Sequence, residues 1–151
     1  MISIIIVSDS SAHFREPVEE YLRRLKGIVE VKVIKPEKSE NSALIRQKES
    51  QRIRELLEKQ RGLVVYCDIG SEILSTESLS EMVEKSKITH PNIIFVVGGA
   101  YGVDESILVS SIHKRISFSP MTFPHSLAFL ILLEQLYRIE QIRKNTGYHH
   151  G

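Results

Sequence analysis

The chain of 151 residues has almost no cysteine, no excess of either charge and no long apolar run. Its single cysteine, Cys67, excludes an internal disulfide framework and suits a reducing compartment. Lys and Arg number 20 against 19 Asp and Glu, so the basic excess common in strong nucleic-acid binders is missing. Any RNA site would therefore depend on where individual basic residues lie.

Signals for a membrane, for secretion and for a metal are also missing. Residues 1–7 are apolar but lack the basic flank and the length of a signal peptide. No apolar run approaches the roughly 20 residues that a helix needs to cross a bilayer. The adjacent His149 and His150 have no Cys or acidic partner at a metal-ligand spacing. We therefore expect a cytoplasmic protein with no membrane association and no metal site.

Short apolar runs rich in β-branched residues alternate with helical patterns along the chain. The expected strands are residues 2–7, 29–34, 63–67, 92–97 and 115–118. The expected helices are residues 15–26, 42–60, 77–87, 104–113 and 124–144. Most of the strand runs are continuously apolar, which indicates a parallel sheet covered on both faces. The pattern predicts one α/β sandwich domain over residues 1–151.

Three segments with unusual chemistry follow expected strands, after Cys67, Val97 and Phe118. Ligands of an open α/β sheet bind outside the carboxyl ends of its strands. The order of elements and the placement of these segments thus predict a binding site at that edge.

The second of these segments is a glycine turn, residues 98–102, with the sequence Gly-Gly-Ala-Tyr-Gly. Glycine is needed where the backbone takes a positive φ or where another group approaches it closely. The spacing matches neither phosphate-binding glycine pattern. The turn is either a tight link between strand and helix or one wall of a ligand pocket.

The third segment, residues 117–125, mixes aromatic, hydroxyl and proline residues. Adenine needs apolar groups on its faces and backbone polar groups at its edge, and such a loop can provide both. The alternative is a loop whose Phe and Met side chains belong to the core. His125, at its end, either acts as a general base or only begins the next helix and binds the loop behind it.

The last expected helix is apolar on more than one stripe between residues 127 and 142. Such a helix must be covered on more than one side. Its own chain could cover it, but the outer helices of a domain this size are normally wet. We therefore expect a homodimer that pairs through this helix.

Several motifs stand in a fixed order along the chain: the glycine turn, the 117–125 segment, Glu134-Gln135-Leu136-Tyr137-Arg138, and Tyr148-His149. Their order and spacing resemble the large-subunit rRNA methyltransferase H family, within the knotted SPOUT class of methyltransferases. Residues 21–25, Glu49 with residues 52–53, and residues 68–77 fit the same family, so the resemblance covers essentially the whole chain.

The resemblance implies a C-terminal deep trefoil knot, a homodimer, and methylation of 23S rRNA at N3 of a pseudouridine on the assembled ribosome. S-adenosyl-L-methionine would be the cofactor. The residues implied to hold it are Cys67, Gly98, Phe118, Ser119, Pro120, Met121, Thr122 and Phe123. Those implied to act on the nucleotide are Arg138, Tyr148, His149 and His125.

The chain departs from the family pattern at four places where a basic residue is usual: Ser8-Asp9, Ser71-Glu72, Phe129 and His150-Gly151. At each place the positive charge is lost where RNA is expected, and contacts to phosphates provide much of RNA affinity. Two alternatives therefore stay open. One is a methyltransferase of another RNA such as tRNA, and the other is a dimeric binding module that has lost catalysis.

Overall fold

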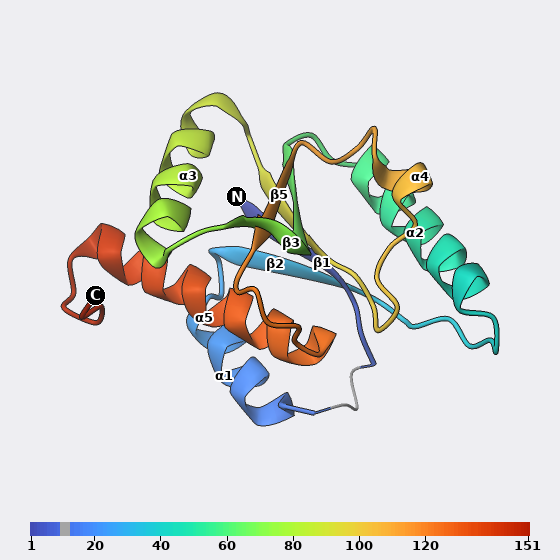
Figure 1. Cartoon of the computed structure of the whole chain (residues 1–151). Coiled ribbons are helices and arrows are strands. Elements are labelled where there is room, and N and C mark those ends of the chain that lie inside the picture. The colour runs from blue at the N-terminus through green and yellow to red at the C-terminus, as the bar shows by residue number, and fades with distance from the viewer. Residues whose placement is uncertain (10–12) are drawn as a thin grey trace.

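A five-stranded parallel sheet forms the centre of the structure, a computed structural model that describes residues 1–9 and 13–151 (Figure 1). The strands are β1 (Ile2–Val7), β2 (Val29–Ile34), β3 (Leu63–Ile73), β4 (Ile93–Val97) and β5 (Lys114–Ser117). Their order across the sheet is β2-β1-β4-β3-β5, and every neighbouring pair is parallel. The predicted parallel α/β architecture is confirmed.

Helices cover both faces of this sheet. They are α1 (Arg15–Arg24), α2 (Ser42–Glu58), α3 (Thr76–Thr89), α4 (Glu105–Leu108) and α5 (His125–Lys144). Residues of α1, α3 and α5 pack in one apolar cluster, and residues of α2 and α4 pack in another on the opposite face. Figure 1 shows α2 and α4 on one side of the sheet, and α1, α3 and α5 on the other.

Strands β1 and β4 are covered by helices on both faces, which explains why their sequences are continuously apolar rather than alternating. Every residue of β1 and β4 is buried. Successive side chains of a strand point to opposite faces. Ile4 and Phe95 accordingly lie in the cluster under α1 and α5, whereas Ile5 and Val96 lie in the cluster under α2.

Side-chain caps fix where two of the helices begin. The Asn41 side chain accepts hydrogen bonds from the Ala43 and Leu44 N–H groups (3.0 and 3.2 Å), and so caps α2. The Ser75 hydroxyl accepts one from the Ser78 N–H (3.0 Å) and caps α3. Oxygen side chains at this position satisfy N–H groups that the first helical turn leaves unpaired.

The third strand is longer than the sequence predicts. Strand β3 continues to Ile73, and Cys67 and Glu72 both lie opposite Ile116 of β5. Residues 68–71 between them therefore bulge out of the sheet, and Gly70 has a φ of 81°. The expected loop after Cys67 is thus a bulge inside β3, because the strand resumes its pairing with β5.

Two further expectations need correction. Helix α4 covers only residues 105–108, because the chain then turns to bring the His113 N–H onto the Val64 carbonyl (3.0 Å). Phe129, where the family commonly has an arginine, is 7% exposed and packs in the core. Within this chain, that departure therefore adds a core residue rather than removing charge from a surface.

None of the helices in residues 1–9 and 13–151 is both long and apolar enough to span a membrane.

Candidate functional site

A pocket of about 630 Å³ lies at the bulge of β3 and at the carboxyl ends of β4 and β5. Its walls come from three segments: the outer part of β3, the glycine turn after β4, and the segment that links β5 to α5. These are the three segments that the sequence singled out, and they are brought together because parallel strands end at the same edge.

Most of the residues assigned to the cofactor line this one pocket. They are Cys67, Gly98, Phe118, Ser119, Met121, Thr122 and Phe123. Pro120 is not in the lining and is exposed. Of the residues assigned to catalysis, only His125 lies in the pocket, at the first turn of α5.

The glycine turn is built by close packing and one positive φ. A Cβ added at Gly98 would lie 3.0 Å from Cγ1 of Val103 and 3.3 Å from the Gly102 carbonyl carbon. Gly102 has a φ of 77°, and its N–H donates to the Gly99 carbonyl at 3.0 Å. A side chain at Gly98 would therefore disturb the turn, and glycine there lets the bare backbone form the pocket wall.

The segment between β5 and α5 holds its own shape through serine hydroxyls. The Ser117 hydroxyl donates to the Ser119 carbonyl (3.1 Å), and the Ser119 hydroxyl accepts from the Met121 N–H (3.0 Å). These local bonds keep the apolar and polar groups of the segment in a fixed order around the pocket.

The pocket is almost free of charge. Burial raises the pKa of the Cys67 thiol to about 12, so this thiol stays protonated and acts as a small apolar group. Burial lowers the pKa of His125, which favours its neutral ring near pH 7. Among the described residues that line the pocket, Asp68 alone has a carboxylate, and none is Lys or Arg.

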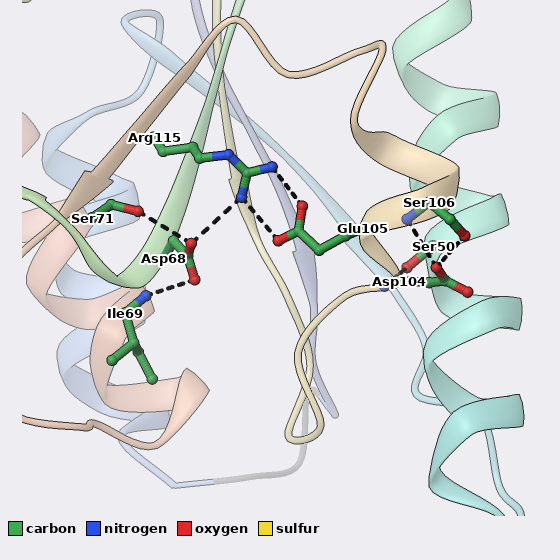
Figure 2. A network of polar contacts seen from close by, with 8 residues as sticks. All are labelled: Ser50, Asp68, Ile69, Ser71, Asp104, Glu105, Ser106 and Arg115. Carbon is green, nitrogen blue, oxygen red and sulfur yellow. Dashed lines mark hydrogen bonds and ion pairs between the residues drawn. The ribbon is translucent and has the colours of Figure 1, made fainter.

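Asp68 belongs to the polar network in Figure 2. One of its oxygens, Oδ1, accepts from the Ile69 N–H at 2.7 Å, and the other accepts from the Ser71 hydroxyl at 3.1 Å. Arg115 of β5 reaches Oδ2 at 3.5 Å and makes closer contacts with Glu105 of α4, at 2.8 and 2.5 Å. The network connects the bulge of β3 to β5 and α4.

The other three residues assigned to catalysis lie together elsewhere. Arg138 binds Glu134 (Nη2 to Oε1, 2.6 Å), and its Nη1 lies 3.3 Å from Nδ1 of His149. Nε2 of His149 lies 2.9 Å from the Glu77 carboxylate on α3. The Arg138 guanidinium also stacks 4.9 Å from the centre of the Tyr148 ring. We call this group of five residues the tail cluster.

Tyr148 is held as a neutral phenol in this cluster. A hydrogen bond with Tyr21, followed by burial, raises the pKa of Tyr148 to about 12. Its ring packs edge-on against Tyr137 with the centroids 5.0 Å apart, and its hydroxyl lies 3.4 Å from Oε1 of Glu134. At neutral pH this hydroxyl stays protonated, so it can donate a hydrogen bond, and the phenolate that could act as a base is not populated.

The pocket lies at the start of α5, and the tail cluster lies against its middle and later turns. His125 and Arg138 are 13 positions apart, which is about 20 Å along a helix axis. No residue of the tail cluster lines the pocket. Within one chain, therefore, the residues assigned to cofactor and to nucleotide form two separate groups.

The structure also shows a residue that the sequence analysis did not identify as important to the site. Glu49 is 2% exposed, and its Oε2 accepts the Glu37 N–H at 3.0 Å. Its Oε1 has no described partner, and a Cβ added at Gly99 would lie 2.8 Å from it. Glu49 therefore supports the glycine turn from behind. The signal was present in the sequence, since Glu49 falls four residues from both Ile45 and Ile53 on the buried face of α2.

Groups of three or more His, Cys, Asp or Glu residues suited to a metal ion are not found in the described part of the chain.

A parallel α/β sheet with an apolar, glycine-lined pocket at the end of its strands is typical of proteins that bind a small, flat, partly polar ligand. Comparison with known proteins identifies a family within this broad class of ligand-binding α/β proteins. A family described as "Predicted SPOUT methyltransferase" matches residues 1–149.

Curated relatives agree with this match over most of the chain. Ribosomal RNA large subunit methyltransferase H of Francisella philomiragia is 36% identical, covering 89% of this chain and 88% of that protein. The proteins of the same name from Clostridium beijerinckii and Mycoplasmopsis pulmonis are 34% and 35% identical, each covering 98% of both chains. The chain belongs to the ribosomal RNA large subunit methyltransferase H family of SPOUT methyltransferases.

Proposed function

We propose that this protein is a homodimeric, S-adenosyl-L-methionine-dependent methyltransferase that modifies 23S rRNA at N3 of a pseudouridine. The observation that carries the proposal is the single pocket formed by the three family segments. The relatives' names support rRNA as the substrate. The cytoplasm, where ribosomes are found, is the expected place of action.

The pocket fits the cofactor in size and chemistry. About 630 Å³ is within the range of small-molecule sites, and apolar walls with exposed backbone suit an adenosine. Phe118, Met121 and Phe123 offer apolar surface, and the backbone of Gly98 can approach the ligand closely. When bound, S-adenosyl-L-methionine supplies a methyl group already activated by its sulfonium.

The chain's own residues would then bind the cofactor, orient the nucleotide and exclude water from the site. Cys67 is not a nucleophile at neutral pH, because its thiol stays protonated. His125 has a neutral ring at the pocket and can accept a hydrogen bond there. Arg138, Tyr148 and His149 would position the nucleotide, since methyl transfer needs the attacking nitrogen in line with the methyl group.

The distance between the two groups of residues supports a homodimer. About 20 Å of α5 separates His125 from Arg138, so one chain does not bring its own tail cluster to its own pocket. Leu127, Leu130 and Ile131 of α5 are only half-buried, although they are apolar. We propose that two chains pair through α5 and that the tail of each one completes the pocket of the other. A deep trefoil knot in the C-terminal part is proposed on the family's fold.

The near-zero net charge agrees with a target presented by a large assembly. With a formal charge of +1, the chain has little long-range attraction for free RNA. The assembled ribosome offers additional docking surface around the target nucleotide. A pocket that positions one nucleotide on such a surface does not need a basic face of its own.

Two experiments test this function. Calorimetry with S-adenosyl-L-methionine and S-adenosylhomocysteine should show binding of both, and no binding of either would end the methyltransferase proposal. Purified ribosomes that lack the modification should then gain one methyl group at N3 of the target pseudouridine, mapped by mass spectrometry. Cofactor binding without methyl transfer would favour the binding module, and methylation of tRNA alone would favour the other RNA substrate.

A further inference from the structure

We propose that Asp68 is a specificity-determining residue that makes the pocket prefer cationic S-adenosyl-L-methionine to the uncharged thioether product. The inference rests on the proposed function, because it concerns the ligand of the same pocket. It adds a role for a residue that no family motif assigns to the cofactor.

The first observation is the isolation of the Asp68 carboxylate. It is the one acidic side chain among the described lining residues, and no Lys or Arg joins it there. The side chain is 27% exposed, so water screens it only in part. A partly screened charge at the wall of an otherwise apolar pocket acts on a bound ion more strongly than it would in water.

The second observation is the charge balance of the network around it. Arg115 is the only cation in contact with Asp68 within the network of Figure 2, at 3.5 Å. The same guanidinium makes two shorter bonds to Glu105, at 2.8 and 2.5 Å. Two carboxylates thus share one cation, and the cation lies closer to the outer one. The pocket side of the network keeps a negative charge.

The third observation is that the bulge of β3 fixes the carboxylate in place. The Ile69 N–H and the Ser71 hydroxyl each bind one of the oxygens of Asp68. The family pattern has Gly-Lys where this chain has Ser71-Glu72, so a hydroxyl that holds the carboxylate replaces glycine and the nearby lysine is lost. The serine hydroxyl orients the Asp68 carboxylate, and without the lysine its charge has one neighbouring cation fewer along the chain.

The negative charge of Asp68 matters because the reaction changes the charge on the sulfur of the ligand. Methyl transfer breaks the S–CH₃ bond, whose electron pair stays on sulfur, and forms an N–CH₃ bond with the electron pair of N3. The N3 proton leaves to solvent. The sulfonium thereby becomes a neutral thioether, while the amino acid part of the ligand keeps both of its charges. Asp68 therefore attracts the cofactor before transfer and loses that attraction afterwards, which favours release of the product.

The test is calorimetry with both ligands on the wild-type protein and on Asp68→Asn. Asparagine keeps the size of the side chain and an oxygen that accepts from the Ile69 N–H, and its NH₂ group can donate to the Ser71 hydroxyl in place of the carboxylate oxygen that accepted from it. We expect the ratio of affinities, S-adenosyl-L-methionine over S-adenosylhomocysteine, to fall about tenfold, as for loss of one charge pair in a partly screened site. An unchanged ratio, including an equal loss of both affinities, would overturn the inference.

Two further variants make the sign of the effect testable. Arg115→Gln removes the cation, so the same ratio should rise about threefold, and a fall would contradict the role of Asp68. Asp104→Asn removes an equal charge at the cap of α4, where the side chain binds Ser106 and does not line the pocket. The ratio should not change in that control. The Arg115 variant also decides the question should Asp68→Asn fail to fold.

The outcomes separate this inference from the function on which it rests. Binding of neither ligand to the wild-type protein would overturn both. Binding of both ligands with a ratio that Asp68→Asn and Arg115→Gln leave unchanged would overturn the role of Asp68 alone.

Discussion

The start and the later turns of α5 carry chemistry of opposite kinds. At its start lies a pocket of backbone and apolar side chains with a single carboxylate, Asp68. Against its middle and later turns lies the tail cluster, where Arg138 contacts Glu134, His149 and Tyr148 at once. The pocket is shaped by the ends of three strands, whereas the cluster is held by side-chain contacts and a short C-terminal tail.

This difference indicates that the pocket and the tail cluster have different roles. A pocket of backbone and apolar groups with one carboxylate suits a cofactor that must be bound in the same way in every cycle. A charged cluster on a tail can exchange its partners, so it suits a nucleotide that arrives and leaves. Substitutions in the pocket and in the tail cluster should therefore affect different steps.

The largest difference between the effect on methylation and the effect on cofactor affinity should come from substitutions in the C-terminal tail. Replacing Tyr148 and His149 by alanine removes the groups proposed to position the nucleotide, so methylation of ribosomes should fall about a hundredfold or more. Affinity for S-adenosyl-L-methionine should stay within about twofold. Single-turnover methylation and calorimetry measure the two effects. His150→Ala, an exposed neighbour, is the matched control, and unchanged methylation in the double variant would remove both residues from the site.

A substitution in the pocket is expected to lower cofactor affinity directly. In Gly98→Val the new side chain meets Val103 and the Gly102 backbone, so the wall of the pocket shifts. Cofactor affinity should fall about tenfold or more, as contacts made by a well-fitted wall are lost. Gly27→Ala is the control, because it places a side chain at a positive φ in open space, far along the sequence from the pocket segments. If calorimetry finds equal losses in the two variants, a general loss of stability explains both.

A smaller effect should appear in stability rather than in binding. Burial raises the pKa of Glu49, partly offset by the Glu37 N–H and by Arg52. The folded state therefore holds the proton more tightly than the unfolded chain does. Glu49 favours folding below its ordinary pKa and opposes folding as the pH rises through its folded-state value.

Glu49→Gln should accordingly raise the free energy of unfolding by about 1 kcal/mol near neutral pH, and should change little near about pH 4. Urea unfolding at the two pH values measures this difference. A variant that is less stable near neutral pH would show that the ionised carboxylate has a partner that Glu49→Gln removes.

The smallest effect is expected at Cys67. Its thiol stays protonated far above neutral pH, so it serves the pocket only as an apolar group. Cys67→Leu, the residue usual in the family, should change cofactor affinity by less than about threefold. It should also leave the dependence of that affinity on pH unchanged between about pH 7 and 9. A loss of affinity at high pH that is confined to the wild-type protein would show that the thiol ionises.

The sequence predicted the parts of the fold that repeat a simple pattern. Continuous apolar runs predicted β1 and β4, because strands covered on both faces have no solvent-facing side. The rule that ligands lie at strand ends predicted the pocket. The continuation of β3 past its bulge could not be predicted, since Asp68 and Gly70 are typical loop residues. Only the pairing of Glu72 and Ile73 with β5 shows that the strand resumes.

Contacts between distant segments were the other part that the sequence did not reveal. The pairing of Arg115 with Asp68 and Glu105 joins three elements whose side chains have no common spacing. The separation of Arg138 from the pocket likewise depends on the length and placement of α5. Motif order along the chain does not reveal this distance, whereas the structure separates His125 from Arg138 by 13 positions of one helix.

The most direct test of this account mixes two chains that are each impaired in methylation. Gly98→Val impairs the pocket and leaves the tail intact, while the Tyr148→Ala and His149→Ala double variant does the reverse. If the tail of one chain completes the pocket of its partner, half of the sites in each mixed dimer combine an intact pocket with an intact tail. Co-expressed and purified mixed dimers should then regain about half of the wild-type methylation of ribosomes. Mixed dimers as impaired as either parent would contradict the shared site.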